Sequence, residues 1–371
     1  MPMLSTCLLN SLTDREVIAE ALNKGYNFAL YRMPGSEYAQ LCVSQHLEYE
    51  YLADNAGSPT GNGFVIAPFA NDRQLFIPAE YSRTINLFSY AKETDKSSQS
   101  KSVKPFYNTQ SMPEDYAKSV NGIIQRLKLD GGKTVFSTIH QGVCTLPLFD
   151  MLVQLSYSYP KAFVFCFKLK DEQRIWLGAT PELLVNFTKQ ELHTMALAGT
   201  RAVSNGEQPW DTKNKKEQAM VKDFIVDKMK AFGLSPELSE PYTRQAGNIE
   251  HICTEISAAL PYRFDLKSFL KELSPTPAVS GLPRDKAMQD IARYEHHSRA
   301  FYAGYCGPVT ADATSLFVTL RCMSFDPTTH ECTLYAGGGI TAESDPATEW
   351  HEVKSKAATL SGPLGISLDI P

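Results

Sequence analysis

Residues 336–356 read AGGGITAESDPATEWHEVKSK, and this stretch gives the strongest indication of both the fold and the chemistry. The glycine triplet Gly337–Gly339 lets the backbone approach a ligand closely. A helix start follows the triplet, and on that helix Glu349, Glu352 and Lys356 are spaced i, i+3 and i+7, which places them on one face. Two carboxylates and one ammonium behind a glycine loop suit a divalent cation together with an anionic small molecule.

The composition sets the class of protein. The chain has 371 residues, of which 43% are apolar, which is ample for a large core, and its net charge of −5 comes without any Lys/Arg-rich block. We therefore expect no nucleic-acid partner. The eight cysteines form no C-x-x-C pair, which argues against a zinc or disulfide framework and fits a reducing compartment. No run approaches the roughly 18 apolar residues of a membrane span, so we expect a cytoplasmic protein.

Strand-like and helix-like segments alternate in runs along the chain. Strands are predicted at 28–31, 39–43, 63–67, 74–78, 133–139, 162–169, 174–178, 191–198, 315–325 and 331–336. Helices are predicted at 14–22, 113–127, between 211 and 273, at 284–292 and at the C-terminal end. Short polar turns between strands suit antiparallel pairing, so the pattern favours an α+β fold over βαβ winding. The Ser- and Lys-rich segment 91–104 is predicted to be a linker or mobile loop.

Lys133 is a candidate base. It opens the strand 133–139, and by alternation it shares a face with Val135 and Ser137. On the apolar side of a sheet the lysine would be desolvated, which favours the neutral amine that can accept a proton. The structural alternative is a lysine at a strand end whose ammonium reaches water.

Glu182 is a candidate acid in the segment GATPE at 178–182. The local pattern favours a helix start, with Thr180 as N-cap, Pro181 at the first helical position and Glu182 in the first turn. The alternative is a functional carboxylic acid at the end of a strand.

Two further charges fall in apolar surroundings. Glu217 precedes Met220 and Val221 by three and four residues, so it shares the buried stripe of its helix, where a carboxylate is costly unless it is paired or bound to metal. It could instead reach solvent at the end of the stripe. Arg321 lies inside the apolar strand 315–325 and needs an anionic partner, either a substrate carboxylate or a structural salt bridge.

Two other features are open to both structural and functional interpretations. His251 has the character of a core histidine, although the residue type also serves in catalysis. Gly199 and Thr200 follow the strand 191–198 and could present backbone N–H groups to an anion or simply form a turn.

Taken together and in this order, the residues resemble the chorismate-utilising enzymes, a family that includes isochorismate synthase, salicylate synthase and the large subunits of anthranilate and aminodeoxychorismate synthases. The matching segments are GATPELL at 178–184, ALAGTR at 196–201, PTPAVSGLPR at 275–284, FYAG at 301–304 and the run 336–356. They cover about residues 110–365, and the likeness is closest to isochorismate synthase.

The resemblance implies a fold of two stacked, mostly antiparallel sheets with helices on the outside and a site in a deep cleft. Residues 1–105 would complete the sheet stack, and residues 106–371 would form the chorismate-binding catalytic region. It also implies Mg²⁺, with Glu217 and Glu352 as ligands and Glu349 as an outer carboxylate. Mg²⁺ keeps several waters and takes few carboxylates, and it would hold the ring carboxylate of the substrate.

Substrate contacts are also implied by the resemblance. Arg321 and Tyr302 are similar to the pair that holds the enolpyruvyl carboxylate. The further expected contacts are Gly199, Thr200, His251, Gly337, Gly339 and Lys356.

The nucleophile decides the product. Members that use ammonia typically lack a lysine at the position of Lys133, whereas members that use water resemble this chain. Lys133 would deprotonate a water that attacks C2, and Glu182 would protonate the departing C4 hydroxyl. We therefore expect an isochorismate synthase that needs no obligatory protein partner and feeds menaquinone or siderophore synthesis. The alternatives are a salicylate synthase, an anthranilate-type subunit and a non-catalytic chorismate-binding protein.

Three positions depart from the family pattern. The helix motif usually reads Lys-Glu-x-x-Glu-His, but here Asn214 and Gln218 replace its first glutamate and its histidine. Ser274 replaces the usual histidine before Pro275. These changes predict weaker Mg²⁺ binding, because groups around metal ligands tune affinity.

Overall fold

The computed structural model describes residues 5–49, 61–70, 73–90, 112–203, 208–247 and 249–369. The helices are α1 (Thr6–Ser11), α2 (Asp14–Asn23), α4 (Glu114–Asp130), α5 (Leu148–Ser158), α6 (Thr212–Ala231), α7 (Leu266–Leu273), α8 (Arg284–Tyr294) and α9 (Pro346–Leu364). The predicted loop 91–104 falls outside the described residues.

The strands form two sheets. Sheet A runs in the order β15 (Gly281–Leu282), β7 (Lys133–Val143), β19 (Glu331–Ile340), β18 (Cys322–Phe325), β9 (Ile175–Thr180), β8 (Phe163–Lys168), β1 (Asn27–Arg32), β2 (Tyr38–Ser44), β6 (Tyr81–Asn86), with β20 (Ser367–Asp369) paired to β7. Sheet B runs in the order β12 (Glu237–Leu238), β14 (Ile249–Ala259), β11 (Glu191–Ala202), β10 (Leu183–Thr188), β17 (Ala313–Val318), β16 (Tyr305–Val309), β4 (Gly63–Ala67), β5 (Leu75–Pro78), β3 (Glu48–Tyr49), with β13 (Tyr242–Ala246) paired to β14.

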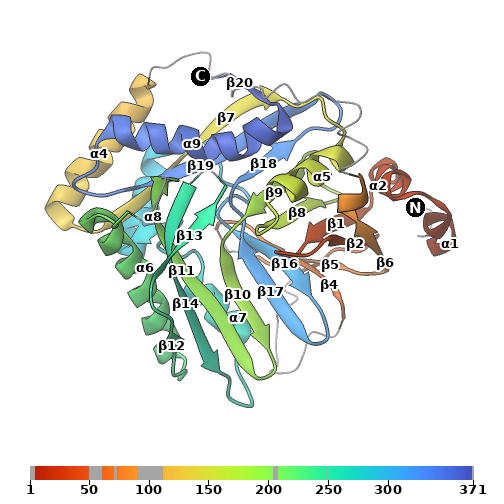
Figure 1. Ribbon diagram of the computed structural model, residues 1–371, viewed down its shortest axis with the longest axis horizontal. Helices are drawn as coiled ribbons and strands as arrows, with labels where there is room; N and C mark the ends of the chain where they lie inside the picture. Colours follow the sequence, from red (N-terminus) through yellow and green to blue (C-terminus); the bar gives the residue numbers. More distant parts are fainter. Residues whose placement is uncertain are drawn as a thin grey trace.

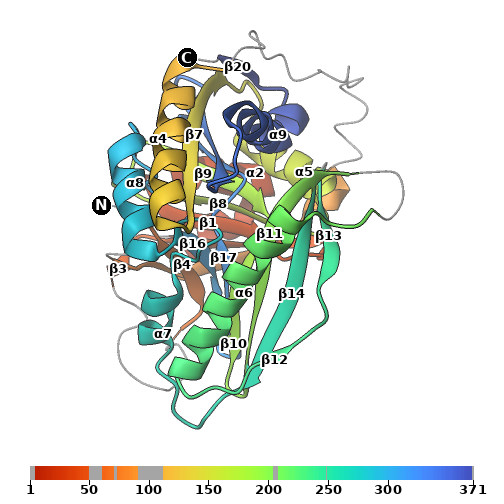
Figure 2. The same cartoon turned by 90° about the vertical axis from the view of Figure 1, so that its left-hand side faces the viewer.

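Each pairing between described strands is antiparallel. Helices α4, α5 and α9 cover sheet A, and α6 runs along β11 and β14 of sheet B (Figures 1 and 2). The predicted α+β fold of two antiparallel sheets with outer helices is confirmed. No helix in the described part of the chain is long and apolar enough to cross a membrane.

Strand β8 shows how the sequence builds both layers of the core. Its alternate rings Phe163, Phe165 and Phe167 belong to the core between the sheets, whereas Val164 and Cys166 belong to the core beneath the outer helices. Phe163 stacks on Phe317 of sheet B with ring centroids 4.1 Å apart. Burial of one such ring stabilises the fold by about 1.5–3 kcal/mol. The two-residue period therefore fixes which side of sheet A faces sheet B.

The N-terminal residues supply strands to both sheets. Strands β1, β2 and β6 lie at one end of sheet A, and β3, β4 and β5 lie at one end of sheet B. The boundary expected near residue 105 falls outside the described part of the chain, so the division at that residue stays a prediction.

The chain passes between the sheets at two adjacent crossovers. The first joins β9 of sheet A to β10 of sheet B through Pro181 and Glu182, and the second joins β17 of sheet B to β18 of sheet A around Arg321. The two are tied together, because Val318 N–H donates to Glu182 O at 3.0 Å and Ala179 N–H donates to Arg321 O at 3.1 Å. Glu182 and Arg321, which are more than a hundred residues apart in the sequence, therefore lie on neighbouring crossovers.

These crossovers correct two predictions. Residues 180–182 do not start a helix: β10 begins at Leu183, directly after the turn. Residues 315–325 are not one strand, since Arg321 has φ +46° and interrupts the run. The strand prediction failed because an apolar run stays apolar when it passes from one buried sheet to another, so the pattern does not mark the change. The helix prediction failed because the same Thr-Pro-Glu residues also suit a turn, in which Glu182 N–H donates to Thr180 Oγ1 at 3.3 Å.

The glycine triplet is part of a strand, which corrects the expectation of a loop. Gly337, Gly338 and Gly339 pair with Ser137, Phe136 and Val135 of β7. On the other side of β19, β18 pairs only as far as Tyr335. The triplet therefore runs past the end of β18, with one edge in the sheet and the other available to a cavity.

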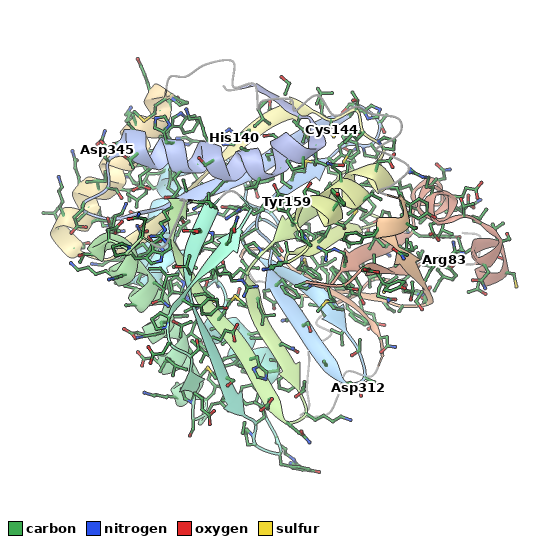
Figure 3. All side chains as sticks on the ribbon, in the orientation of Figure 1. Arg83, His140, Cys144, Tyr159, Asp312 and Asp345 are labelled. Atoms are coloured by element: carbon green, nitrogen blue, oxygen red, sulfur yellow. The ribbon has the colours of Figure 1, made fainter. Side chains whose placement is uncertain are left out.

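Helix α9 lies across the outer face of sheet A (Figure 1). Asp345, labelled in Figure 3, caps its N-terminus by accepting from Thr348 N–H at 2.9 Å, and Pro346 occupies the first helical position. Trp350 and Val353 bury their side chains in the core below. This packing fixes the face that carries Glu349, Glu352 and Lys356.

Candidate active site

A cavity opens where the two crossovers meet the glycine edge of β19. Its lining includes most of the residues that the sequence singled out: Glu182, Gly199, Thr200, Glu217, His251, Tyr302, Arg321, Gly337, Gly339 and Lys356. Lys133, Glu349 and Glu352 are not part of this lining, but Lys133 contacts Glu217 and Glu352 contacts Lys356, both of which are. The structure thus brings residues from both sheets, α6 and α9 to one place.

Glu182 is a buried acid with an unusual proton affinity. Its side chain lies on the first crossover and is only 6% exposed. Burial raises the pKa of Glu182 to about 7, against the opposing charges of Lys133, Arg321 and Lys356. A large share of this carboxyl therefore carries a proton near neutral pH, as a general acid requires.

Lys133 is buried, which rules out the alternative of an ammonium in water. Its side chain is 1% exposed and donates to Glu217 Oε1 at 2.6 Å. Burial by itself would raise the pKa of Glu217, but the charge and hydrogen bond of Lys133 outweigh it, and the pKa lies below its ordinary value. Glu217 is thus an ionised carboxylate paired with a buried ammonium.

The glycines leave space for these side chains. A Cβ on Gly339 would lie 2.6 Å from Lys133 Cε and 2.8 Å from Glu217 Oε1. A Cβ on Gly337 would lie 2.9 Å from the Tyr302 hydroxyl oxygen. Any side chain at either position would therefore collide with the functional groups that the triplet accommodates.

Arg321 is oriented by a histidine. Its Nη2 donates to His251 Nε2 at 3.1 Å, and His251 Nδ1 lies 2.8 Å from Gly199 O. Because a guanidinium only donates and a carbonyl only accepts, Nδ1 carries the proton of a neutral ring. Burial and the charge of Arg321 lower the pKa of His251 to about 3, which agrees with that state. His251 is both a buried histidine and part of the cavity wall.

Asn214 holds an irregularity within β11, because the strand does not end at Ala198 as predicted but continues through Gly199 and Thr200 to Ala202. Its Oδ1 accepts from Thr200 N–H at 2.9 Å, and its Nδ2 donates to Asp211. Gly199 adopts φ +71°, a conformation that favours glycine, where the pairing of β11 with β14 shifts register. The departure at this position therefore has a structural role in placing the Gly199–Thr200 backbone.

Gln218, which replaces the usual histidine, also has a hydrogen-bond partner. Gln218 is buried and donates from Nε2 to Thr254 Oγ1 at 2.9 Å, which ties α6 to β14.

Each carboxylate predicted to bind metal contacts a lysine. Lys133 binds Glu217, Lys213 donates to Glu349 Oε1 at 2.8 Å, and Lys356 donates to Glu352 Oε1 at 2.7 Å. Lys356 also donates to Gly337 O at 2.9 Å. As the side chains lie, the described residues contain no group of three or more His, Cys, Asp or Glu side chains that could hold a metal ion.

The donor set nevertheless suits Mg²⁺. A Cβ on Gly338 would lie 3.5 Å from Glu349 Oε2 and 3.9 Å from Glu352 Oε1, so the two carboxylates converge over a bare stretch of backbone. Burial and the neighbouring charge of Glu352 raise the pKa of Glu349. Hard oxygen donors that repel one another are stabilised by a hard divalent cation.

Sequence reasoning missed part of the wall. Tyr335 lies between two aromatic rings, with its centroid 5.5 Å from that of Tyr302 and 5.2 Å from that of Trp176. Ala278 and Val279 complete an apolar side of the cavity. Nothing in the local pattern distinguishes Tyr335 from other aromatic strand residues, whereas Ala278 and Val279 lie in the segment 275–284 that carried the family likeness.

Lys213 was also missed. No local pattern singles it out, since a lysine on the first turn of a helix usually faces solvent.

The cavity thus combines cationic side chains with a buried carboxyl whose pKa is raised. Residues 67–365 match the family model described as chorismate binding enzyme. The chain belongs to the family of chorismate-binding enzymes.

Several relatives are isochorismate synthases. The chain is 34% identical over 199 residues to isochorismate synthase MenF of Escherichia coli, a match that covers 51% of this chain and 46% of that protein. It is 29% identical over 276 residues to isochorismate synthase DhbC of Bacillus subtilis, covering 68% of each chain. The solved structure of E. coli MenF has the same fold, with a TM-score of 0.70 at 21% identity over 91% of this chain and 89% of that one. The matched segment thus spans about half the length of MenF.

Proposed function

We propose that the protein is a Mg²⁺-dependent isochorismate synthase that adds water to C2 of chorismate and expels the C4 hydroxyl. The observation that carries the proposal is the presence of two buried ionisable groups, one in the cavity wall and one directly behind it. Glu182 is a carboxylic acid whose pKa lies near 7, and Lys133 is a lysine that is 1% exposed. The similarity to isochorismate synthases supports the same activity.

Cationic and backbone groups would hold the substrate. Arg321, oriented by His251, and Tyr302 would bind the enolpyruvyl carboxylate through hydrogen bonds to its two oxygens. Further contacts would come from the remaining polar lining: Gly199, Thr200, Gly337, Gly339 and Lys356. The apolar wall around Tyr335 would face the ring.

A cation would change the partners of the carboxylates. Glu217 and Glu352, with Glu349 behind them, would hold Mg²⁺, which would supply positive charge to the ring carboxylate and to Glu217. Lys133, which is buried beside Glu217, is the group that would act on the attacking water in this proposal.

The proposed reaction moves two protons. Lys133 Nζ, as the amine, takes a proton from water while the water oxygen forms a bond to C2. The two ring double bonds shift from C1–C2 and C5–C6 to C1–C6 and C4–C5 as the C4–O bond breaks. Glu182 donates its proton to the departing oxygen, which leaves as water. General acid–base help of this kind accelerates a reaction by roughly 10²–10⁴-fold per group.

We also propose a cytoplasmic location and a role in supplying menaquinone or siderophore synthesis. All eight cysteines are free, and seven of them are buried, which suits a reducing compartment. The E. coli relative is described as menaquinone-specific. Because water is the nucleophile in this proposal, no partner that delivers ammonia is needed.

The test is a product assay. The purified chain is incubated with chorismate and Mg²⁺ without ammonia, and the products are separated by chromatography. Isochorismate alone supports the proposal. Salicylate with pyruvate would instead indicate a salicylate synthase, a product formed only after ammonia is added would indicate an anthranilate-type enzyme, and no turnover at any Mg²⁺ concentration would contradict the proposal.

A further inference from the structure

Lys213 differs from the other lysines of the site. Lys133 and Lys356 have side chains that are 1% and 16% exposed and contact residues of the cavity wall, whereas the Lys213 side chain is 38% exposed. Lys213 lies on the first turn of α6, one turn before Glu217. Its ammonium therefore approaches the carboxylates from the solvent side and has room to withdraw.

The partner of Lys213 needs a positive charge. Glu349 is 2% exposed, and its Oε1 accepts from Lys213 Nζ at 2.8 Å and from Ser344 Oγ at 2.6 Å. A buried carboxylate without a cation is strongly destabilising. Lys213 provides that cation from within the chain.

The same ammonium interacts with all three carboxylates. The charges of Glu349, Glu217 and Glu352 each act on Lys213, in addition to the direct contact with Glu349. A divalent ion bound by these carboxylates would meet the repulsion of an ammonium that shares their charge. Such an ion and Lys213 would therefore compete for the same negative charge.

We propose that Lys213 is an internal counter-ion that neutralises Glu349 in the metal-free protein and that a divalent cation must displace. The inference rests on the proposed Mg²⁺ site, and it assigns Lys213 the role of setting the threshold cation concentration at which the site fills. A lysine with a purely structural salt bridge would have the opposite effect, because its removal would loosen the site and weaken cation binding.

The test measures cation binding rather than turnover. Mn²⁺, which prefers the same oxygen donors, is titrated into metal-free protein without substrate, and free Mn²⁺ is followed by electron paramagnetic resonance. Lys213→Met is expected to bind Mn²⁺ at least tenfold more tightly than the wild type. In chelator, the midpoint of thermal unfolding of Lys213→Met is expected to be lower than that of the wild type. Addition of Mn²⁺ is expected to raise the midpoint of the variant by more than that of the wild type.

Lys216→Met is the matched control, since Lys216 is exposed on the same helix and its loss changes the net charge equally. Lys213→Gln is the second variant. It keeps a hydrogen-bond donor for Glu349 without the charge, and it replaces Lys213→Met in the test if that variant does not fold. It is also expected to bind Mn²⁺ more tightly.

Affinities for Lys213→Met and Lys213→Gln that equal that of Lys216→Met, or fall below it, would overturn the inference. A failure of isochorismate formation with tighter Mn²⁺ binding intact would contradict the proposed function alone.

Discussion

Glu182 and Glu217 border the same cavity, and both are largely removed from water, yet they differ in charge. The pKa of Glu182 is raised by burial to about 7, whereas the pKa of Glu217 is lowered by Lys133 in spite of burial. The charge of Lys133 acts on both, but only Glu217 is in contact with it, at 2.6 Å. A direct ion pair, rather than the degree of burial, decides which carboxyl holds a proton.

The local structure explains the difference. Glu182 sits on a tight crossover whose backbone is fixed by Val318, and none of the ion pairs found among the described residues includes its side chain. Glu217 projects from α6 and reaches across to the first residue of β7. One scaffold thus provides a proton donor and an anion.

The largest expected effect is on turnover. Glu182→Gln keeps the shape of the side chain but has no acidic proton, so kcat is expected to fall about 10²–10⁴-fold with chorismate affinity kept. Steady-state kinetics together with a calorimetric titration measure both quantities. A kcat within threefold of the wild type would show that Glu182 is not the acid.

The second prediction tests the ion pair. Glu217→Gln leaves the ammonium of Lys133 buried without a counter-charge, and we expect the free energy of unfolding to fall by about 3–5 kcal/mol. Glu182→Gln at pH 8, measured alongside in urea, is expected to be neutral or stabilising, because it removes a buried acid that has no ion-pair partner in the described part of the chain. Equal losses of unfolding free energy in the two variants would contradict the view that only Glu217 is stabilised by an ion pair.

The third prediction concerns pH. Because the folded pKa of Glu182 is about 7 and its ordinary value is 4.5, folded protein holds a proton between these values that unfolded protein releases, so the contribution of Glu182 to stability declines as pH rises through this window. The gap corresponds to about 3 kcal/mol.

Relative to wild type, Glu182→Gln should therefore become progressively more stable from pH 4.5 to pH 8, as urea unfolding at each pH would measure. For Glu217, whose pKa is lowered, the sign is reversed: its contribution is present above its ordinary pKa and is lost as pH falls. A pH-independent difference between Glu182→Gln and wild type would contradict the raised pKa.

The smallest effect concerns the room beside Glu217. Gly339→Ala would place a Cβ 2.6 Å from Lys133 Cε, and overpacking of this kind costs about 1–3 kcal/mol. Gly362→Ala is the control, because a Cβ there meets nothing within 4 Å and the residue lies in α9. Thermal melts should separate the two variants, and equal midpoints would argue against a tight fit around the ion pair.

Much of the fold follows from alternation in the sequence. The two-residue period in Phe163–Lys168 marks both a strand and its two buried faces, and the capping residues Asp345 and Asp211 mark where α9 and α6 begin. Alternation does not show which of the two sheets a strand belongs to. Arg321 and Glu182 lie where the chain changes sheets, and their sequence neighbourhoods looked like a continuous strand and a helix start.

From the sequence, the site could be predicted only from the types of its residues and their order along the chain. Glu349, Glu352 and Lys356 could be placed on one face because helix geometry is local. The contact between Lys133 and Glu217 joins residues 84 positions apart, and no local rule links them. The roles of these residues in catalysis stay predictions until the variants are measured.

The most direct test of the account is isotopic. Chorismate is incubated with the protein and Mg²⁺ in H₂¹⁸O, and the product is analysed by mass spectrometry. The account predicts isochorismate with one ¹⁸O in the C2 hydroxyl, and loss of that product in Lys133→Met with chorismate binding retained. Unlabelled isochorismate, or undiminished labelled product from Lys133→Met, would contradict water addition by Lys133.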